Sequence, residues 1–333
     1  MIDNIFYTSE EVARFMDDYS SRGMPYLFAF DYELNEGLFI ESPHNQSEVL
    51  FKFSNGTNFR RDFIIENSQE HLKILHTDTL DTYRNKFNII IQGLSRGDSY
   101  LANLTCKSRI STDLDPIMIL SSTYSPFALY VPDRFLSFSP ERFVKVENGI
   151  ISSFPMKGTI DANIPYAESS ILNNYKESSE HATITDLIRN DIGMVSDNVW
   201  VERYRYIDKI STDRGEILQV SSDIRGRLKQ EFSNSLGSLI LSLLPAGSIS
   251  GAPKRSTVEL IAKAEFIPRG FYTGIAGFFD GNSLDSAVLI RYIEFDKEGG
   301  IFYRSGGGIT INSNVDEEYM EMINKIYLPL RRC

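Results

Sequence analysis

The chain has little cysteine: Cys106 and Cys333 are the only two in 333 residues. Two cysteines are too few for a disulfide framework or a thiolate metal site, so a reducing compartment is expected. The N-terminal segment also lacks the basic residues and apolar run of a signal peptide. No stretch approaches the roughly 20 apolar residues of a membrane-spanning helix. We therefore expect a soluble, cytoplasmic protein without a membrane partner.

Positive charge is also scarce, because 34 Lys and Arg stand against 45 Asp and Glu, which gives a net charge of −11. This balance disfavours nucleic acid as a partner, since phosphate binding needs a basic face. It does not exclude a small anionic substrate, which needs only a few local cations and a metal. Hydrophobic residues make up 42% of the chain, as expected for a globular protein with a substantial core.

No linker-like tract and no repeat divides the chain, so we predict one domain over residues 1–333. Helical spacing or capping residues predict helices at 8–20, from Asp78 to Gly97, from 166 to Arg189, at 233–244, 254–265 and 315–327. Strand-like runs lie between them in pairs, including 26–32 with 37–42, a pair around a predicted turn at 146–149, and later runs at 271–279, 286–295 and 300–304. Paired strands favour antiparallel sheets in an α+β architecture.

Acidic residues on the last predicted helix form one candidate site. Glu318, Glu321 and Lys325 are spaced i, i+3 and i+7 and so share a face. A solvated face would have the same spacing, and from spacing alone it is the commoner explanation. A magnesium site would need carboxylates from elsewhere or substrate oxygens. Glu180, beside His181 on another predicted helix, is a candidate, although spacing does not bring the two helices together.

Lys157 is unusual because apolar, strand-like residues flank it in the segment SFPMKGTI. It could be a lysine at a strand end that reaches solvent. Alternatively, it could be a partly desolvated lysine that supplies a neutral amine nucleophile.

Two glycine-rich loops could bind an anion. The segment 244–254 is not a Walker A loop, because Ala252 and Pro253 separate its last glycine from Lys254. In the segment 305–309, successive backbone amides could bind a carboxylate, or the glycines could form only a tight turn.

Eight segments occur together in an order that resembles the chorismate-utilising enzymes, a family that includes anthranilate, aminodeoxychorismate, isochorismate and salicylate synthases. The segments are SPERF (139–143), PMKGT (155–159), DLIRNDIG (186–193), GSISGAPK (247–254), YTGIAG (272–277), LIRYIEF (289–295), SGGGI (305–309) and EEYMEMINKI (317–326). The resemblance covers about residues 95–330, and residues 1–94 form a shorter N-terminal part than in many relatives. It implies two packed, mostly antiparallel sheets flanked by helices.

In the family that this chain resembles, the residue before the Gly-Thr step is lysine in aminodeoxychorismate synthases and alanine in anthranilate synthases. In this sequence it is Lys157. The members of the family that use water as the nucleophile have a catalytic lysine at another position. By the resemblance, that position is occupied here by Leu101. The resemblance therefore implies an aminating subunit of aminodeoxychorismate synthase, which serves 4-aminobenzoate and folate biosynthesis. The alternatives are anthranilate synthase component I, an isochorismate or salicylate synthase, and, least favoured, a chorismate-binding paralogue without activity.

The resemblance also assigns roles to residues. Lys157 would be the nucleophile, Glu141 the general acid, and Glu180 and Glu321 direct Mg²⁺ ligands with Glu318 acting through water. The substrate-binding set would be Gly158, Thr159, Ser250, Tyr272, Arg291, Gly306, Gly307, Gly308 and Lys325, with the first two on the ring carboxylate.

One departure and one missing motif complete the sequence analysis. Gln219 stands where the family often has a histidine, and glutamine cannot exchange a proton near neutral pH. No cysteine lies in a glutaminase-like context. Ammonia is therefore expected from a separate glutamine amidotransferase subunit.

Overall fold

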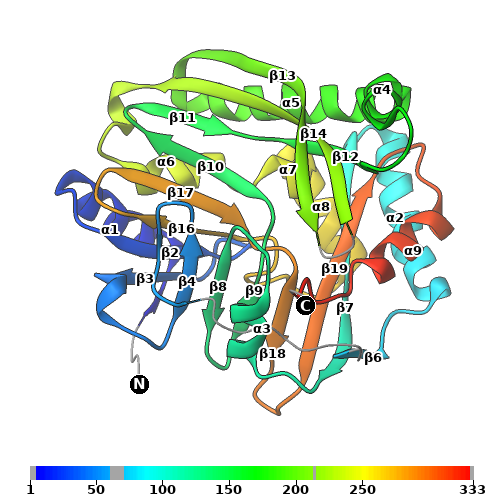
Figure 1. Ribbon diagram of the computed structural model, residues 1–333, viewed down its shortest axis with the longest axis horizontal. Helices are drawn as coiled ribbons and strands as arrows, with labels where there is room; N and C mark the ends of the chain where they lie inside the picture. The colour runs from blue at the N-terminus through cyan, green and yellow to red at the C-terminus, as the bar shows by residue number, and fades with distance from the viewer. Residues whose placement is uncertain (1–4, 61–70, 213–214, 331–333) are drawn as a thin grey trace.

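Two antiparallel β-sheets pack face to face at the centre of the structure, a computed structural model that describes residues 5–60, 71–212 and 215–330 (Figure 1). The first sheet has the order β1 (Phe6–Tyr7), β3 (Gly37–Glu41), β2 (Tyr26–Phe30), β16 (Ile275–Phe279), β17 (Ser283–Val288), β10 (Arg142–Glu147), β11 (Ile150–Ser153), β14 (Gly215–Leu228) and β12 (Met156–Asp161), with β13 (Ser196–Thr212) beside β14. The second has the order β15 (Gly251–Ala252), β7 (Leu101–Thr112), β19 (Ile301–Ile309), β18 (Tyr292–Phe295), β9 (Phe135–Ser137), β8 (Ala128–Val131), β4 (Leu50–Phe53) and β5 (Gly56–Thr57), with β6 (Leu72–His76) beside β7.

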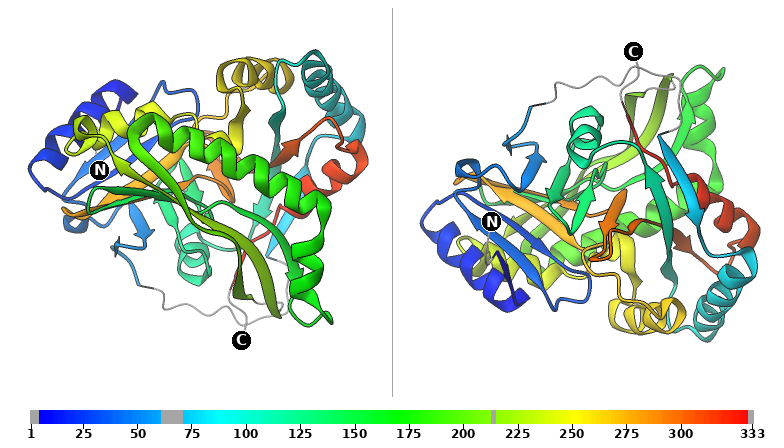
Figure 2. Two further views of the ribbon diagram at one scale, coloured as in Figure 1. Left: turned by 90° about the horizontal axis from the view of Figure 1, so that it is seen from above. Right: turned by 90° about the horizontal axis from the view of Figure 1, so that it is seen from below.

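Helices cover the outer face of each sheet. On the first sheet lie α1 (Ser9–Ser21), α5 (Tyr175–Val195) and α6 (Leu236–Leu243), and on the second lie α2 (Leu80–Arg96), α8 (Lys254–Glu265) and α9 (Val315–Asn324). Viewed from above, α5 runs along the β13–β14 ribbon (Figure 2). Shorter helices are α3 (Pro116–Ser122), α4 (Ala167–Asn173) and α7 (Gly247–Ser250), with 3-10 turns at Pro43–Asn45 and Gln230–Phe232. Apolar cores fill the space between the sheets and beneath both helical layers.

The predicted single α+β domain with two packed antiparallel sheets is confirmed. Thr8 caps α1 through a capping box, and Gly97 ends α2 in the left-handed conformation. The predicted turn between β10 and β11 has Asn148 at φ 52° and Gly149 at φ 72°, as a two-residue hairpin requires.

Two predicted elements need correction, and one pair of strands was missed. The strand predicted at 286–295 is two strands, β17 and β18, in different sheets, because the chain turns at Arg291 with φ 52°. The helix predicted from 166 to Arg189 is broken at Asn174, whose side chain caps α5, and it then continues to Val195. The β13–β14 ribbon was not predicted from the sequence.

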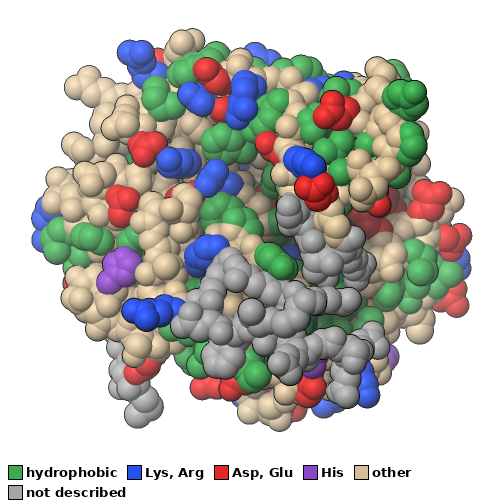
Figure 3. Space-filling view, viewed as in Figure 1, with side chains coloured by type: hydrophobic (Ala, Val, Ile, Leu, Met, Phe, Trp, Pro, Cys, Tyr) green, Lys and Arg blue, Asp and Glu red, His purple; other side chains and the backbone are tan. Residues whose placement is uncertain are grey.

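The surface carries charges of both signs. On the face shown in Figure 3, Lys and Arg are interspersed with Asp and Glu, and acidic side chains gather at the right-hand edge over α9. The first turn of α9 holds Asp316, Glu317 and Glu318. No helix within the described residues is long and apolar enough to cross a membrane.

Gly251 joins the second sheet to the loop before α8 at a place where no side chain fits. Its φ is +124°, and a Cβ would lie 1.8 Å from the Leu101 carbonyl oxygen. We predict that Gly251→Ala lowers the free energy of unfolding by about 3 kcal/mol, because the backbone is strained and strand β15 must move. Gly149→Ala, where φ is +72° and no atom lies within 4 Å, should cost only about 1 kcal/mol. Urea denaturation measures both, and equal losses would contradict the prediction.

Candidate active site

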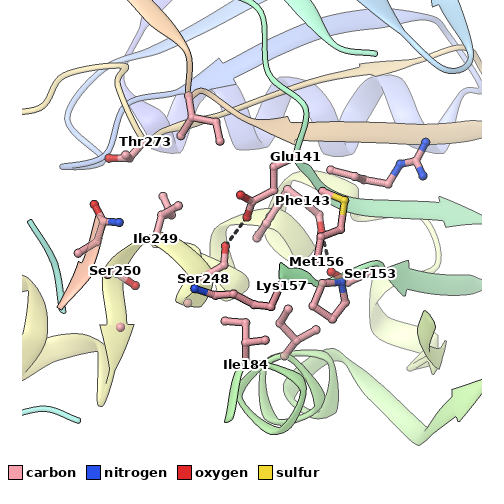
Figure 4. A pocket seen from close by; sticks show the side chains of 18 of the residues that line it. Glu141, Phe143, Ser153, Met156, Lys157, Ile184, Ser248, Ile249, Ser250 and Thr273 are labelled. Carbon is pink, nitrogen blue, oxygen red and sulfur yellow. Dashed lines mark hydrogen bonds between the residues drawn. The ribbon is translucent and has the colours of Figure 1, made fainter. Parts of the chain in front are cut away.

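A pocket of about 280 Å³ opens where strands of both sheets meet α5 and the turn 244–251 (Figure 4). Most of the sequence-predicted site residues line it: Glu141, Lys157, Gly158, Ser250, Tyr272, Arg291, Gly306, Gly307, Gly308, Glu321 and Lys325. Leu101 and Gln219 line it as well. Thr159, Glu180 and Glu318 stand outside this lining and adjoin it through the contacts described below.

Glu141 lies immediately before β10, and its carboxylate accepts a hydrogen bond of 2.9 Å from the Ser248 hydroxyl. Burial raises the pKa of the Glu141 carboxyl above its usual value, although that hydrogen bond and the cations Lys157, Arg291 and Lys325 oppose the shift. The side chain of Lys157, from β12, extends into the pocket beneath the Glu141–Ser248 pair (Figure 4). A carboxyl group that holds its proton to higher pH thus lies close to an amine.

The turn that carries Ser248 is held in place by two further charged groups. Asp191 on α5 forms an ion pair of 2.9 Å with Lys254, which also donates to the Leu243 carbonyl oxygen at 2.7 Å. A Cβ on Gly247 would lie 2.9 Å from the Asp191 carboxylate, so only glycine allows this close approach. The ion pair therefore fixes the backbone on both sides of Ser248.

Lys157 and Glu180 bring β12 and α5 together. The Lys157 Nζ lies 3.6 Å from Glu180 Oε2, and the two side chains are 41% and 33% exposed. Gly158 has φ +81°, and a Cβ there would lie 3.0 Å from Glu177 Oε2. Thr159 is exposed and pairs with Gln219 across β14. The neighbouring His181 has its pKa lowered to about 4, chiefly by burial, so this imidazole is neutral near pH 7.

The glycines of β19 allow α9 to approach the sheet. A Cβ on Gly307 would lie 3.2 Å from Glu318 Oε2 and 3.5 Å from Glu321 Oε1. Lys325, at the end of α9, pairs with Glu321 at 2.6 Å and donates to the Gly306 carbonyl oxygen at 2.8 Å. The sequence-predicted face of α9 therefore lies against β19 at the edge of the pocket, with Glu321 still 54% exposed.

The paired carboxylates of Glu318 and Glu321 suit a hard cation such as Mg²⁺, which takes one or two protein carboxylates together with waters and substrate oxygens. No group of three or more Asp, Glu, His or Cys close enough to hold a metal occurs among the described residues. Glu180, expected as a direct ligand together with Glu321, lies 3.6 Å from the Lys157 amine.

Arg291 and Tyr272 also line the pocket. The left-handed backbone at Arg291 turns its guanidinium toward the pocket, where it lies over the Tyr327 ring with its CZ atom 5.4 Å from the centroid. Burial raises the pKa of Tyr272 to about 12, so its phenol remains a hydrogen-bond donor. Together with Lys325, these groups suit a carboxylate.

Comparison with known sequences identifies the family, because residues 16–331 match the sequence profile described as chorismate binding enzyme. The chain belongs to the chorismate-binding enzyme family. An uncharacterized PabA-like protein of Haemophilus influenzae is 42% identical over 313 residues, which cover 94% of each chain. Anthranilate synthase component 1 of Acetivibrio thermocellus is 33% identical over 70% of this chain and 49% of that protein. Aminodeoxychorismate synthase component 1 of Bacillus subtilis is 30% identical over 75% of this chain and 55% of that protein.

Among solved structures, one described as a 2,3-dihydroxybenzoate-specific isochorismate synthase, DhbC, from Bacillus anthracis superposes with a TM-score of 0.74. It covers 98% of this chain and 90% of that one at 18% identity. At this identity the likeness supports the fold of the chorismate-binding enzymes and no particular reaction.

Sequence reasoning overlooked three residues in or beside this pocket. Ser248 contacts Glu141, and Asp191 with Lys254 holds the turn of Ser248. All three lie within the family segments DLIRNDIG and GSISGAPK, so the signal was present. The sequence alone did not show that these two segments contact each other.

We predict that Ser248→Ala moves the alkaline limb of the pH profile to higher pH. The hydroxyl lowers the pKa of Glu141, so removing it raises that pKa further, and the carboxyl keeps its proton to higher pH. The measurement is kcat/KM for chorismate consumption against pH, with Ser242→Ala on the exposed face of α6 as control. An unmoved limb, or one moved to lower pH, would show that Glu141 is not the acid.

Proposed function

We propose that this chorismate-binding enzyme is the aminating subunit of aminodeoxychorismate synthase, which converts chorismate and ammonia to 4-amino-4-deoxychorismate. The observation that carries the proposal is Lys157, a primary amine in the pocket beside the protonatable Glu141. Leu101 lines the same pocket. By the resemblance, it stands where relatives that use water have a catalytic lysine. It supports amination over hydration because its side chain has no proton to transfer.

In the proposed reaction, the Lys157 amine bonds to ring carbon 2 and the ring double bonds shift. The bond from carbon 4 to its hydroxyl breaks as Glu141 donates a proton, so water leaves. Ammonia then bonds to carbon 4, the double bonds shift back, and carbon 2 releases the Lys157 amine. The proton that ammonia loses returns to Glu141. The net result is exchange of a hydroxyl for an amino group.

The other pocket residues hold the two carboxylates of the substrate. Arg291, Tyr272, Lys325 and the amides of Gly306–Gly308 suit the enolpyruvyl carboxylate. The amide of Gly158, in the lining, and that of Thr159, beside it, are proposed for the ring carboxylate. Glu318, Glu321 and Glu180 would hold Mg²⁺, which would supply positive charge to the ring carboxylate.

Ammonia is proposed to come from a glutamine amidotransferase subunit, because the sequence has no glutaminase-like cysteine. The PabA-like and aminodeoxychorismate synthase names of the relatives agree with this partner. Anthranilate formation is the second candidate, because an anthranilate synthase component 1 has slightly higher identity than the aminodeoxychorismate synthase component 1. Lys157 argues against it, because the resemblance places alanine there in anthranilate synthases.

Replacing the nucleophile tests this proposal. We expect the parent protein, given chorismate, an ammonium salt and Mg²⁺, to form 4-amino-4-deoxychorismate. Lys157→Ala should lower that rate by about a thousandfold or more, since the covalent path is lost. Products are separated by liquid chromatography and identified by mass, and Lys209→Ala, 58% exposed on β13, is the control. Anthranilate or isochorismate as the parent's product would refute the proposed reaction, and full activity of Lys157→Ala would remove the amine from the mechanism.

A second test concerns the proposed metal. Glu321→Gln should raise the Mg²⁺ concentration for half-maximal activity by about tenfold or more, because it replaces a carboxylate ligand with a neutral amide. Glu317→Gln, exposed on the same helix, should leave the requirement unchanged. A chelator series and a direct Mg²⁺ titration measure the effect. Equal requirements in both variants would exclude Glu321 as a ligand.

A further inference from the structure

Asp191 on α5 is an acidic residue of the pocket for which the proposed reaction has no chemical role. Three carboxylates among the described residues line the pocket, and the other two, Glu141 and Glu321, are the acid and a metal ligand in the proposed function. Chorismate carries two ionised carboxylates at neutral pH, so a further carboxylate repels it. The charge of Asp191 suits the other reactant instead, because ammonium is a cation.

The side chain of Asp191 reaches the pocket. Ile184, Ile188 and Ile192 line the pocket from the same helix, and together with Asp191 they recur at the spacing of one helix face. Figure 4 shows Ile184 pointing from α5 toward Lys157. The Asp191 side chain is 15% exposed, so a group of the size of water or ammonium can touch it.

The contacts of the Asp191 carboxylate leave part of its hydrogen-bonding capacity for a ligand. Its Oδ1 lies 2.9 Å from the Lys254 ammonium, which is outside the lining of the pocket. The carboxylate also accepts a hydrogen bond from the Gly247 amide. An ionised carboxylate has about four lone-pair positions, and these two donors use two of them. Asp191 is thus held from behind and can accept from a donor inside the pocket.

Asp191 lies close to the acid of the proposed reaction. Gly247, which donates to Asp191, is followed by Ser248, whose hydroxyl donates to Glu141 at 2.9 Å. The two carboxyl groups therefore flank one dipeptide. In the proposed function Glu141 protonates the hydroxyl that leaves carbon 4, so a nitrogen held by Asp191 is near the carbon that it must reach.

We infer that Asp191 binds ammonium and accepts the proton that ammonium must lose before its nitrogen can attack; the inference rests on the proposed function. One N–H bond breaks, its electron pair stays on nitrogen and forms the bond to carbon 4, and Asp191 later releases the proton to solvent. Glu141 takes the second proton once the new bond has formed. Burial raises the pKa of Asp191, although Lys254 opposes the shift, so its carboxylate is a stronger base than aspartate in water.

The experiment compares two variants that break the same ion pair. Asp191→Asn removes the carboxylate, whereas Lys254→Met removes its partner and leaves the carboxylate in the pocket. KM for ammonium chloride is measured at saturating chorismate and Mg²⁺, with the ionic strength held by tetramethylammonium chloride, which donates no hydrogen bond. Asp191→Asn should raise this KM by about tenfold or more, since a charge-assisted hydrogen bond is lost. Lys254→Met should leave it unchanged or lower it, because the carboxylate loses a competing cation.

Binding of chorismate shows whether a variant only deforms the pocket. Its dissociation constant is measured by titration calorimetry with Mg²⁺ and without ammonium, and in Asp191→Asn it should stay within about twofold of the parent value. An unchanged KM for ammonium in Asp191→Asn would overturn the inference. Equal rises of that KM in both variants would also overturn it, since they would show that the pair is only a brace.

A further comparison covers a failure to fold. If Asp191→Asn does not fold with Lys254 left unpaired, the double variant Asp191→Asn/Lys254→Met removes both charges and is compared with Lys254→Met alone, with the same expected difference. Ammonium should also raise the thermal midpoint of Lys254→Met more than tetramethylammonium does, because it binds the carboxylate that the lysine has left, and an equal effect of the two salts would overturn the inference. Isochorismate formed at a rate independent of ammonium would refute the proposed function, whereas ammonium-dependent amination that is equal in both variants would refute only this inference.

Discussion

The walls of the pocket depend on one buried ion pair. Arg269 donates through Nε and Nη2 to the two carboxylate oxygens of Glu265, at 2.9 and 2.6 Å, and the side chains are 1% and 5% exposed. Its remaining N–H groups reach Asn103, Ile249 and Thr273, so five donors meet five acceptors. Glu265 in turn accepts from the Thr105 amide at 2.8 Å. Removing either partner of such a pair typically costs about 3–5 kcal/mol, because the other charge remains buried.

This constraint explains how a pocket between two sheets keeps its geometry. Asn103 belongs to the second sheet, Ile249 to the turn that carries Ser248, and Thr273 to the segment that leads into β16 of the first sheet. The three come from distant parts of the chain and share one rigid, planar donor group. The Asp191–Lys254 pair adds a second brace on the turn of Ser248. The turn whose Ser248 hydroxyl donates to Glu141 is therefore tied to both sheets.

The sequence predicted local structure well where a single residue decides the backbone. Thr8, Gly97 and the Asn148–Gly149 turn ended or began elements where predicted, because caps and positive φ are local properties. The β13–β14 ribbon escaped prediction because its residues, such as Arg203 and Glu202, are mostly polar. The candidate site was found through eight ordered segments, which gave residue types but no contacts. The contact between Ser248 and Glu141 and the contact between Lys157 and Glu180 are tertiary contacts. Spacing along the chain contains no information about them.

The same scaffold can host several reactions because its fixed and variable parts are different residues. In the proposed function, Arg291 and Lys325 belong to the groups for the two carboxylates that every chorismate-utilising enzyme must bind. The reaction is then set by the few side chains that face the ring carbons. This pocket is lined by an amine at Lys157, an alkyl chain at Leu101 and an amide at Gln219, which we propose face the ring. Glutamine and leucine cannot activate water, whereas an amine can replace it as the first nucleophile. Leu101 and Gln219 leave this pocket without proton-transfer groups at two positions. These missing groups restrict the possible reactions more than the anion-binding groups do.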